Sequence, residues 1–262
     1  MPLNLSRRTA APAIDEFYTS IHDRMLREAA RNAEIRPTAR EFSNTLDRFS
    51  IKGVRNALDA GCGGTASFTL AFAERGLSKV TAIDINEANL TRARALIKRR
   101  HTKVVYFTMA SVTELPFQDG TFDLAVCSGV VHHTEEPARA IQELARVVKP
   151  GGILYISVYC FADSAFEKIV RALRIVGGYL PFLLVQRLCG WSRVMNNFIL
   201  DHMYVPVLWL FRADEVRSVI ARSELTILEE WPSSIDPFAR FPGLSSLLTG
   251  DGLLRVWLCQ KH

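Results

Sequence analysis

The chain has 262 residues, of which 48% are hydrophobic, and its formal net charge is +5 with a pI of about 9.1. This length and composition suit one well-buried α/β domain with an added cap, and they exclude a low-complexity chain. The basic residues are scattered, and the cations between Arg92 and Arg100 are typical of the solvated end of a helix. We therefore expect no nucleic-acid partner.

The sequence also lacks the patterns that direct a chain to or across a membrane. Arg7 and Arg8 are not followed by an apolar stretch, so no secretory signal is predicted. The most hydrophobic stretch, Val176 to Val185, is interrupted by glycines and by Pro181, and it is too short to span a bilayer. These features predict a cytoplasmic protein without a transmembrane segment.

The five cysteines, Cys62, Cys127, Cys160, Cys189 and Cys259, include no C-x-x-C pair. Zinc sites need closely paired ligands, so we expect no metal site. Most of these cysteines lie in or beside predicted strands, which favours buried, reduced thiols.

The predicted elements begin with a disordered tail over residues 1–13. Apolar residues at helical spacing predict a helix over 14–33, and a second helix is expected over 38–49, after Pro37. Strands then alternate with helices, with strands expected at 56–60, 80–84, 104–109, 124–127 and 153–159 and helices at 66–75, 87–98 and 136–147. This alternation predicts a parallel sheet covered by helices on both faces.

Residues 161–212 break the alternation and are rich in Leu, Val, Phe and Trp, which predicts a helical insertion. A helix over 213–222 and strands over 225–231 and 254–260 complete the chain. We therefore divide the chain into N-terminal helices (1–50), a core (51–160), a cap (161–212) and a C-terminal part of the core (213–262).

A glycine turn follows the first predicted strand. Gly61 and Gly63 have no Cβ, so the main chain can approach a ligand, and helix N–H groups behind such a turn favour negative charge. Asp84 ends the next strand, where a carboxylate can accept hydrogen bonds from a ribose. A connection without any ligand is the alternative, but turn, acid and strand order favour a nucleoside-containing ligand. Phe68 stands where a dinucleotide site has a small residue, which argues against a dinucleotide.

The motif Asp59-Ala-Gly61-Cys-Gly63-Gly-Thr65 resembles the first motif of class I S-adenosylmethionine-dependent methyltransferases of the type 11 kind. Further segments are similar to later motifs of that family: Leu115-Pro116-Phe117, Phe122 to Ser128, His132-His133 and Leu144 to Gly152. The resemblance implies a Rossmann-like, mostly parallel sheet of seven strands, with the last strand antiparallel between the fifth and sixth. It also implies S-adenosylmethionine as the cofactor. Thr65 departs from the usual final glycine.

The resemblance assigns a cofactor site to Asp59, Gly61, Cys62, Gly63, Asp84, Ile85, Ala110, Ser111, Val112 and Ser128, with Tyr18 closing over it from the N-terminal helices. Asp84 is expected to bind both ribose hydroxyls, Ile85 to lie against the adenine, and Ser128 to lie near the sulfonium. Ser111 replaces the usual acid beside the adenine. The alternatives are that Ser111 and Ser128 are ordinary loop hydroxyls and that Tyr18 is a core residue.

For the substrate side, His133 is the candidate for substrate contact or proton removal. Tyr159 at a strand end, and His202 and Tyr204 in the cap, are further candidates, although a structural turn before Pro206 explains the last two equally well. The apolar segments 179–185 and 209–211 form a lid, pack in the core, or join two copies of the chain in a homodimer.

These features predict an enzyme that transfers a methyl group from S-adenosylmethionine to a small, partly apolar molecule by direct displacement, in which the protein supplies proximity and alignment. Two alternatives stay open: a methyltransferase-like binding subunit without activity, and an RNA or protein methyltransferase.

Overall fold

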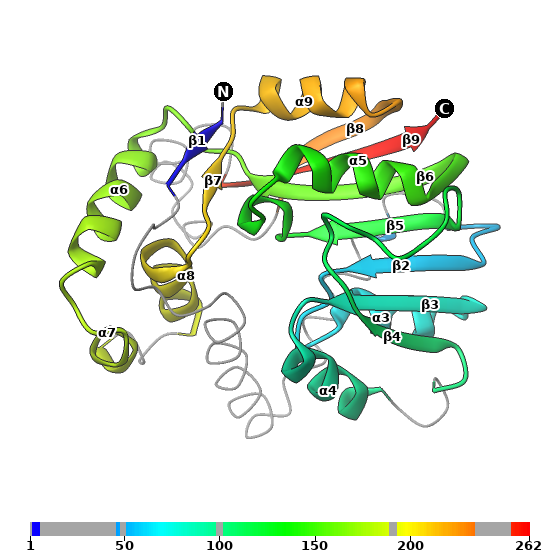
Figure 1. The fold of residues 1–262 in the computed structure, drawn as a ribbon, viewed down its shortest axis with the longest axis horizontal. Coiled ribbons are helices and arrows are strands. Elements are labelled where there is room, and N and C mark those ends of the chain that lie inside the picture. Colours follow the sequence, from blue (N-terminus) through cyan, green and yellow to red (C-terminus); the bar gives the residue numbers. More distant parts are fainter. Residues whose placement is uncertain (1, 6–45, 48–50, 98–101, 189–192, 234–252) are drawn as a thin grey trace.

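A seven-stranded sheet organises the part of the chain that the computed structural model describes, which comprises residues 2–5, 46–47, 51–97, 102–188, 193–233 and 253–262 (Figure 1). The expected helix over 14–33, with Tyr18, lies outside these residues, as does all but a fragment of the helix expected over 38–49. The division of the chain into four parts stays a proposal.

The strands are β2 (Asn56–Ala60), β3 (Lys79–Asp84), β4 (Val105–Met109), β5 (Phe122–Ser128), β6 (Val148–Tyr159), β8 (Leu225–Pro232) and β9 (Leu254–Lys261), in the spatial order β4-β3-β2-β5-β6-β9-β8. β9 runs antiparallel to both β6 and β8, and the other pairings are parallel. The predicted fold class is therefore confirmed. β6 begins at Val148 rather than at the expected Ile153, because Val148 pairs with Phe122 across a register shift.

Alternating side chains of the strands fill two cores, one on each face of the sheet. On β2, Ala57 packs on one face with the apolar side of α3 (Ser67–Glu74), whereas Leu58 and Ala60 pack on the other with α5 (Pro137–Val147) and α9 (Ala213–Arg222). α4 (Glu87–Leu96) covers Ala82 on the α3 side. Burial on both faces explains why these strands read as continuous apolar runs.

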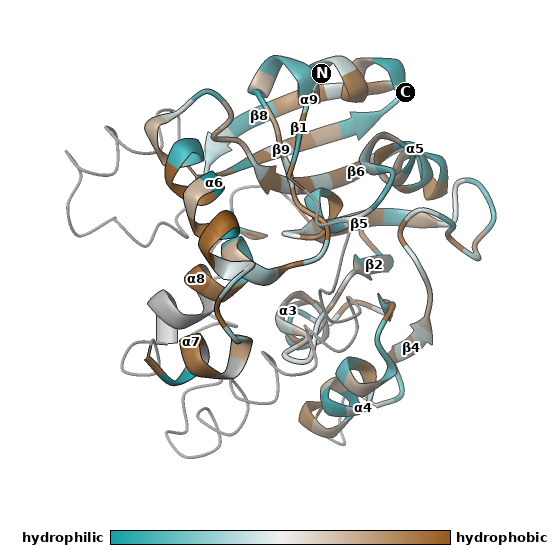
Figure 2. Cartoon of the chain, turned by 60° about the vertical axis from the view of Figure 1, so that its left-hand side comes forward, coloured by the Kyte–Doolittle hydropathy of each residue, from teal (hydrophilic) through white to brown (hydrophobic). Residues whose placement is uncertain are grey.

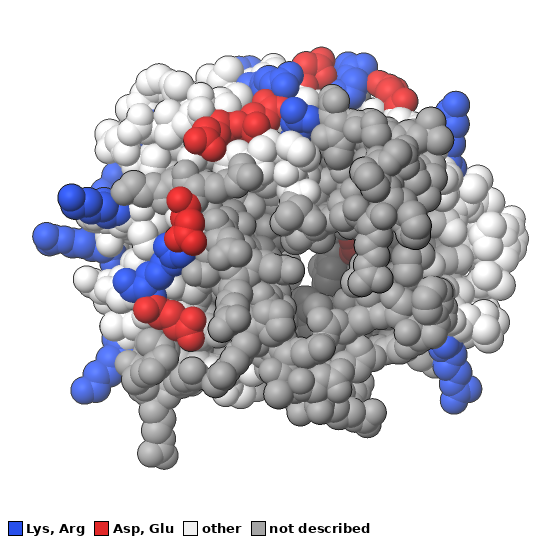
Figure 3. All heavy atoms as spheres, turned by 180° about the vertical axis from the view of Figure 1, so that it is seen from behind, with Lys and Arg blue, Asp and Glu red and all other residues white. Residues whose placement is uncertain are grey.

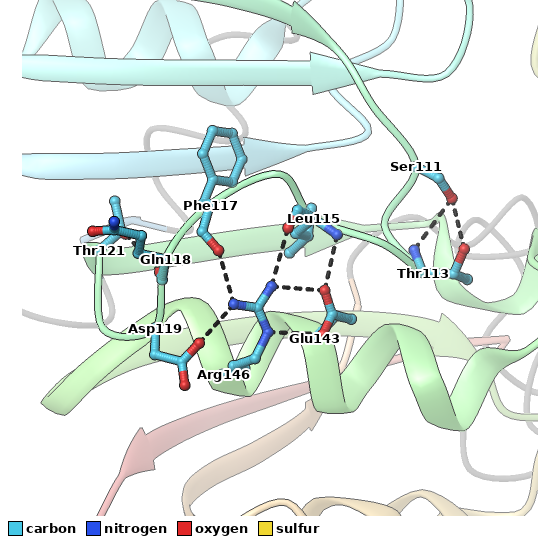
Figure 4. Close-up of polar contacts among 9 residues, drawn as sticks. All are labelled: Ser111, Thr113, Leu115, Phe117, Gln118, Asp119, Thr121, Glu143 and Arg146. Carbon is cyan, nitrogen blue, oxygen red and sulfur yellow. Dashed lines mark hydrogen bonds and ion pairs between the residues drawn. The ribbon is translucent and has the colours of Figure 1, made fainter.

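Arg146 on α5 fixes the loop that follows β4 (Figure 4). Its guanidinium donates to the carbonyls of Leu115 (3.0 Å) and Phe117 (2.8 Å) and to the carboxylates of Glu143 and Asp119. Glu143 in turn accepts the N–H of Leu115 at 2.9 Å. Two segments that the sequence singles out separately are thus joined, and the loop between β4 and β5 is held against α5.

The insertion forms a cap with its own hydrophobic core, beside the sheet in Figure 1. It contains α6 (Ala165–Gly177), α7 (Phe182–Leu188), α8 (Arg193–Tyr204) and the short strand β7 (Trp209–Leu210). Buried Arg174 on α6 donates to the carbonyls of His202 (3.1 Å) and Val205 (2.8 Å), so it satisfies acceptors at the end of α8. No helix within the described ranges is long and apolar enough to cross a bilayer.

The start of the chain corrects one expectation. Leu3 and Asn4, expected in a disordered tail, form strand β1 (Leu3–Asn4) and pair antiparallel with Leu210 and Trp209 of β7. Leu5 extends the pairing by donating its N–H to the carbonyl of Leu208 at 2.8 Å. The pairing joins segments that are distant in the sequence, which local composition does not reveal.

Two glycines with the same backbone angle provide a test of the turn after β2. Gly61 and Gly76 have φ values of +81° and +80°. An added Cβ at Gly61 would overlap the side chain of Val130, whereas at Gly76 it would meet no heavy atom within 4 Å. We expect Gly76→Ala to lower the free energy of unfolding by about 1–2 kcal/mol, and Gly61→Ala to lower it by about 1–3 kcal/mol more. Urea unfolding measures both; equal losses would contradict the close packing at Gly61.

Candidate functional site

A pocket of about 650 Å³ opens at the carboxyl ends of β2, β3, β4 and β5, where parallel sheets bind ligands. Its walls come from the turn after β2, the tip of β3, the loops after β4 and β5, and the segment that follows α8. All the expected cofactor residues that the structure describes line it: Asp59, Gly61, Cys62, Gly63, Asp84, Ile85, Ala110, Ser111, Val112 and Ser128.

The turn after β2 is tied to the tip of β3. Gly61 and Cys62 donate their N–H groups to the carbonyl of Ile83 at 2.8 and 2.9 Å, and the N–H of Gly63 donates to Asp84 Oδ2 at 2.9 Å. Gly61 and Gly63 both have positive φ, which permits this path. The main chain of the turn therefore forms part of the pocket wall, and its two glycines add no side chains of their own.

The carboxylate of Asp84 is held on both oxygens. Besides Gly63, it accepts the N–H of Asn86 at 2.9 Å and the side-chain amide of Asn89 at 3.2 Å, both through Oδ1. A carboxylate offers about four acceptor positions, so one remains, on Oδ2. The expectation that Asp84 binds two hydroxyls thus requires one of these protein donors to move.

Asn89 is a site residue that the sequence analysis missed. It lies one turn into α4, is almost fully buried and lines the pocket. The available signal was its spacing from Asn86, which caps this helix by accepting the N–H groups of Ala88 and Asn89. A polar residue three positions after such a cap lies on the same face as the strand tip.

Asp59 points into the protein, toward α3. Its Oδ2 accepts the N–H and the hydroxyl of Thr69 at 2.9 and 2.6 Å, so it anchors the start of that helix. Burial raises the pKa of Asp59 to about 6, and the two bonds from Thr69 only partly offset this. Asp59 therefore supports the pocket wall while also lining it.

The residues that follow β3 and β4 give the pocket both apolar and polar surface. Ile85 is 56% exposed and lines the pocket, so it offers an apolar surface. Ser111 Oγ bonds with the hydroxyl of Thr113 at 2.7 Å and accepts the Thr113 N–H at 3.2 Å. The N–H of Ala110 donates to the carbonyl of Asp84. Ser111 is thus engaged in the local turn, as the alternative of an ordinary loop hydroxyl predicts, although it also lines the pocket.

His133 lines the pocket from a short 3-10 helix, Val131–His133, after β5. Its Nδ1 lies 2.9 Å from the carbonyl oxygen of Val207, and its Nε2 lies 3.6 Å from Asp201 Oδ2. The hydroxyl of Tyr159 donates to the same oxygen of Asp201 at 2.6 Å. Burial opposes ionisation of Asp201, but His133, His202 and Tyr159 hold its pKa well below the usual value. Both ring nitrogens of His133 face protein acceptors, so proton removal from a substrate would require one contact to break.

The other expected substrate residues lie outside the described lining of the pocket. His202 is fully buried, with the rings of Tyr159 and Phe161 packed against it. Tyr204 is buried and donates its hydroxyl to the carbonyl of Leu180 at 2.8 Å. Neither these residues nor Tyr159 is among the described residues that line the pocket. They belong to the core of the cap and to its contact with the sheet.

Of the alternatives given for the segment 209–211, the structure shows packing in the core. Leu210 and Phe211 are buried, and the indole N–H of Trp209 donates to the carbonyl of Thr134 at 3.0 Å. The bond from Trp209 therefore fastens the cap to the loop after β5, which lines the pocket.

Ser128 lines the pocket from the end of β5, and its Oγ bonds with Ser157 Oγ on β6 at 2.9 Å.

A further part of the wall was not predicted from the sequence. It is formed by Val130, Thr134, Glu135, Glu136, Pro206 and Val207. The lining in the described part of the chain has four carboxylates, those of Asp59, Asp84, Glu135 and Glu136, and no Lys or Arg. Such a lining favours a ligand with positive charge and provides no fixed cation for an anionic one.

The described cysteines, Cys62, Cys127, Cys160 and Cys259, are buried free thiols, as expected. Burial raises the pKa of Cys62 well above the usual thiol value, so its side chain forms a neutral part of the pocket wall. Within the described ranges, no three His, Cys, Asp or Glu side chains are grouped as metal ligands.

Residues 58–156 match the family model of a methyltransferase domain. The ubiquinone biosynthesis O-methyltransferase of Pseudomonas paraeruginosa is 32% identical over 158 residues, which are 57% of this chain and 67% of that protein. The enzyme of the same name from Pseudomonas fluorescens is 31% identical over 166 residues, 59% of this chain and 69% of that one.

The fold is similar to solved structures of low sequence identity. A putative methyltransferase from Haloferax volcanii, solved in complex with the Trm112 methyltransferase activator, superposes with a TM-score of 0.62 at 17% identity, covering 92% of this chain and 98% of that one. An S-adenosylmethionine-dependent methyltransferase from Mesorhizobium loti superposes with a TM-score of 0.55 at 19% identity, covering 80% and 91%.

The raised pKa of Asp59 predicts a pH dependence of stability. The pKa of Asp59 is about 6 in the folded chain, against the ordinary value of 3.8 for an aspartate carboxyl in the unfolded chain. Between these two pH values the folded state therefore binds more protons than the unfolded state. Relative to Asp59→Asn, the free energy of unfolding of the wild type should fall by up to about 3 kcal/mol from about pH 4 to about pH 7. Urea unfolding across this range measures the difference; a constant difference would contradict the burial of a titrating Asp59.

Proposed function

Because the chain belongs to the class I S-adenosylmethionine-dependent methyltransferases, we propose that it transfers the methyl group to a hydroxyl oxygen of a small, partly apolar molecule. The chain is an enzyme that uses S-adenosylmethionine as methyl donor; the acceptor is the proposed part. The observation that carries the proposal is the described lining of the pocket, which combines apolar surface with carboxylates and lacks Lys and Arg.

The pocket suits the cofactor in shape and charge. A volume of about 650 Å³ lies within the range of small-molecule sites and holds a nucleoside together with a second small molecule. S-adenosylmethionine has a sulfonium and an ammonium group, and the carboxylates of Asp84, Glu135 and Glu136 in the described lining complement these positive charges. Gly61 and Gly63 add no side chains of their own to this part of the wall.

We assign the ribose to Asp84 and Asn89, because the open acceptor position of Asp84 and the amide of Asn89 face the same pocket. Ile85 would lie against the adenine, and Ala110 to Val112 would form the edge of that subsite. The Gly61–Gly63 turn would face the methionine portion. When bound, the cofactor supplies a methyl group that the sulfonium charge activates toward attack by a nucleophile.

The acceptor would lie beside this turn, against the wall of Val130, Pro206 and Val207, whose surface is largely apolar. Relatives named ubiquinone biosynthesis O-methyltransferases support a hydroxyl as the methylated group. The protein would act mainly by holding the hydroxyl in line with the methyl group, and such alignment lowers a barrier by up to roughly 7–11 kcal/mol.

His133 would serve this alignment by position rather than as a base. Its contact with the Val207 carbonyl holds the apolar wall against the loop after β5, and Asp201 holds its second nitrogen. The absence of Lys and Arg from the described lining favours a small molecule over RNA, since RNA binding relies on cations that contact phosphates.

The ribose assignment predicts a loss of cofactor affinity in Asp84→Ala. A hydrogen bond to a charged group contributes about 1.5–3 kcal/mol, so S-adenosylhomocysteine should bind at least about tenfold more weakly. The matched control is Glu87→Gln, which removes an exposed carboxylate at the start of α4, three residues after Asp84; it pairs with Arg94 and is not part of the described pocket lining. Isothermal titration calorimetry measures both variants; equal affinity of Asp84→Ala and wild type would refute the assignment.

The acceptor class can be tested with phenols that carry apolar chains of increasing length, beside the corresponding anilines and benzoates. We expect S-adenosylhomocysteine release and a methyl ether product from the phenols, with kcat/KM rising with chain length because the far wall is apolar. Mass spectrometry identifies the methylated atom. Turnover of anilines alone, or of RNA or protein but no phenol, would contradict the proposal.

A further inference from the structure

The outer surface of the cap exposes an unusual amount of apolar side chain. α6, α7 and the turn between them present seven large apolar residues to solvent: Ile169, Ile175, Val176, Tyr179, Leu180, Leu184 and Leu188. Tyr179, in the turn, is 85% exposed. We call this surface the outer cap face; Figure 2 shows α6 and α7 with long hydrophobic stretches. Contiguous apolar patches of this kind mark sites of contact with another surface.

The exposed charges on this face have one sign. Lys168, Arg171 and Arg187 are exposed. The single acidic residue between Ala165 and Leu188 is Glu167, which is buried and accepts from Arg171 Nε at 2.7 Å and from the N–H of Asp163. In Figure 3 this edge of the molecule, at the right, shows uncharged atoms with Lys or Arg side chains above and below.

We propose that the outer cap face binds the surface of an anionic lipid bilayer. Apolar side chains bounded by Lys and Arg are the pattern of helices that lie in the interface of a membrane, with the cations at anionic headgroups. A tyrosine at the apex of the turn suits the headgroup level, because its ring is apolar and its hydroxyl is polar. The net charge of +5 acts in the same direction.

Charge decides between a bilayer and a second copy of the chain, which the sequence also suggested. In a two-fold symmetric dimer the same patch meets itself, so Lys168 and Arg187 would face equivalent cations, with no exposed carboxylate between Ala165 and Leu188 to pair with them. An anionic headgroup layer pairs with these cations and receives the apolar side chains. The bilayer is therefore the occupant that satisfies both features of the face.

The test is sedimentation of the full chain with lipid vesicles, without cofactor or acceptor, so that its result is independent of the proposed methyl acceptor. Vesicles of phosphatidylcholine alone are compared with vesicles containing about one third phosphatidylglycerol. We expect binding to the anionic vesicles, with affinity falling at least about tenfold when salt is raised to about 0.5 M.

Three variants separate the contributions. Tyr179→Glu/Leu184→Glu should weaken binding to anionic vesicles at least about tenfold, and so should Lys168→Gln/Arg187→Gln. Leu228→Glu is the matched control, because Leu228 is an exposed apolar residue on β8, away from the cap, and should bind like the wild type. Retained binding of S-adenosylhomocysteine shows that each variant is folded.

The proposal is overturned if the wild type stays in solution with anionic vesicles at low salt. It is also overturned if Lys168→Gln/Arg187→Gln and the wild type bind anionic vesicles equally. A third contrary result is a wild type that binds no vesicles but is a dimer in sedimentation velocity, with Tyr179→Glu/Leu184→Glu monomeric.

Discussion

The three N–H groups of the turn Gly61–Gly63 all donate to the tip of β3, two to the carbonyl of Ile83 and one to the carboxylate of Asp84. This connection fixes the distance between two adjacent strand tips and therefore the shape of the pocket. It is possible because Gly61 and Gly63 adopt positive φ, and because Gly61 has no Cβ to meet Val130. The turn and the acid are thus one structural unit, although they lie on different strands.

The cap contributes to the pocket through a few polar connections rather than through its own polar residues. The segment after α8 reaches the loop after β5 through the contact of His133 with the Val207 carbonyl and the bond from Trp209 to Thr134. Asp201 on α8 adds to this connection, because it accepts a hydrogen bond from the hydroxyl of Tyr159 and lies 3.6 Å from Nε2 of His133. A shift of α8 would move the apolar wall that faces the turn, so the packing of the cap determines the space left for an acceptor.

The fold of the core was predictable because its strands are buried on both faces and are separated by helices with recognisable ends. Asn86 caps α4 and Gly76 follows α3, as expected from their residue types. The cofactor side of the pocket was predictable for the same reason: strand tips in a parallel sheet lie at one edge, so Asp59, Asp84 and Ser128 had to be near one another.

The cap was not predictable to the same degree, because polar residues in an insertion can be functional or can pair with each other. His202 and Tyr204 stood out by their chemistry, but they satisfy partners within the cap, and Arg174, which holds the end of α8, gave no local signal. The pairing of Leu3 with Leu210 depends on tertiary contact alone. Pro206 and Val207 reach the pocket only because α8 ends beside it.

The most direct measurement of the central claim is a crystal structure of the chain with S-adenosylhomocysteine. The account predicts a ribose hydroxyl within about 3 Å of Asp84 Oδ2, with the bond from Gly63 N–H to Asp84 retained. A ligand whose ribose lies away from Asp84, or a turn that leaves β3 when the ligand binds, would contradict it.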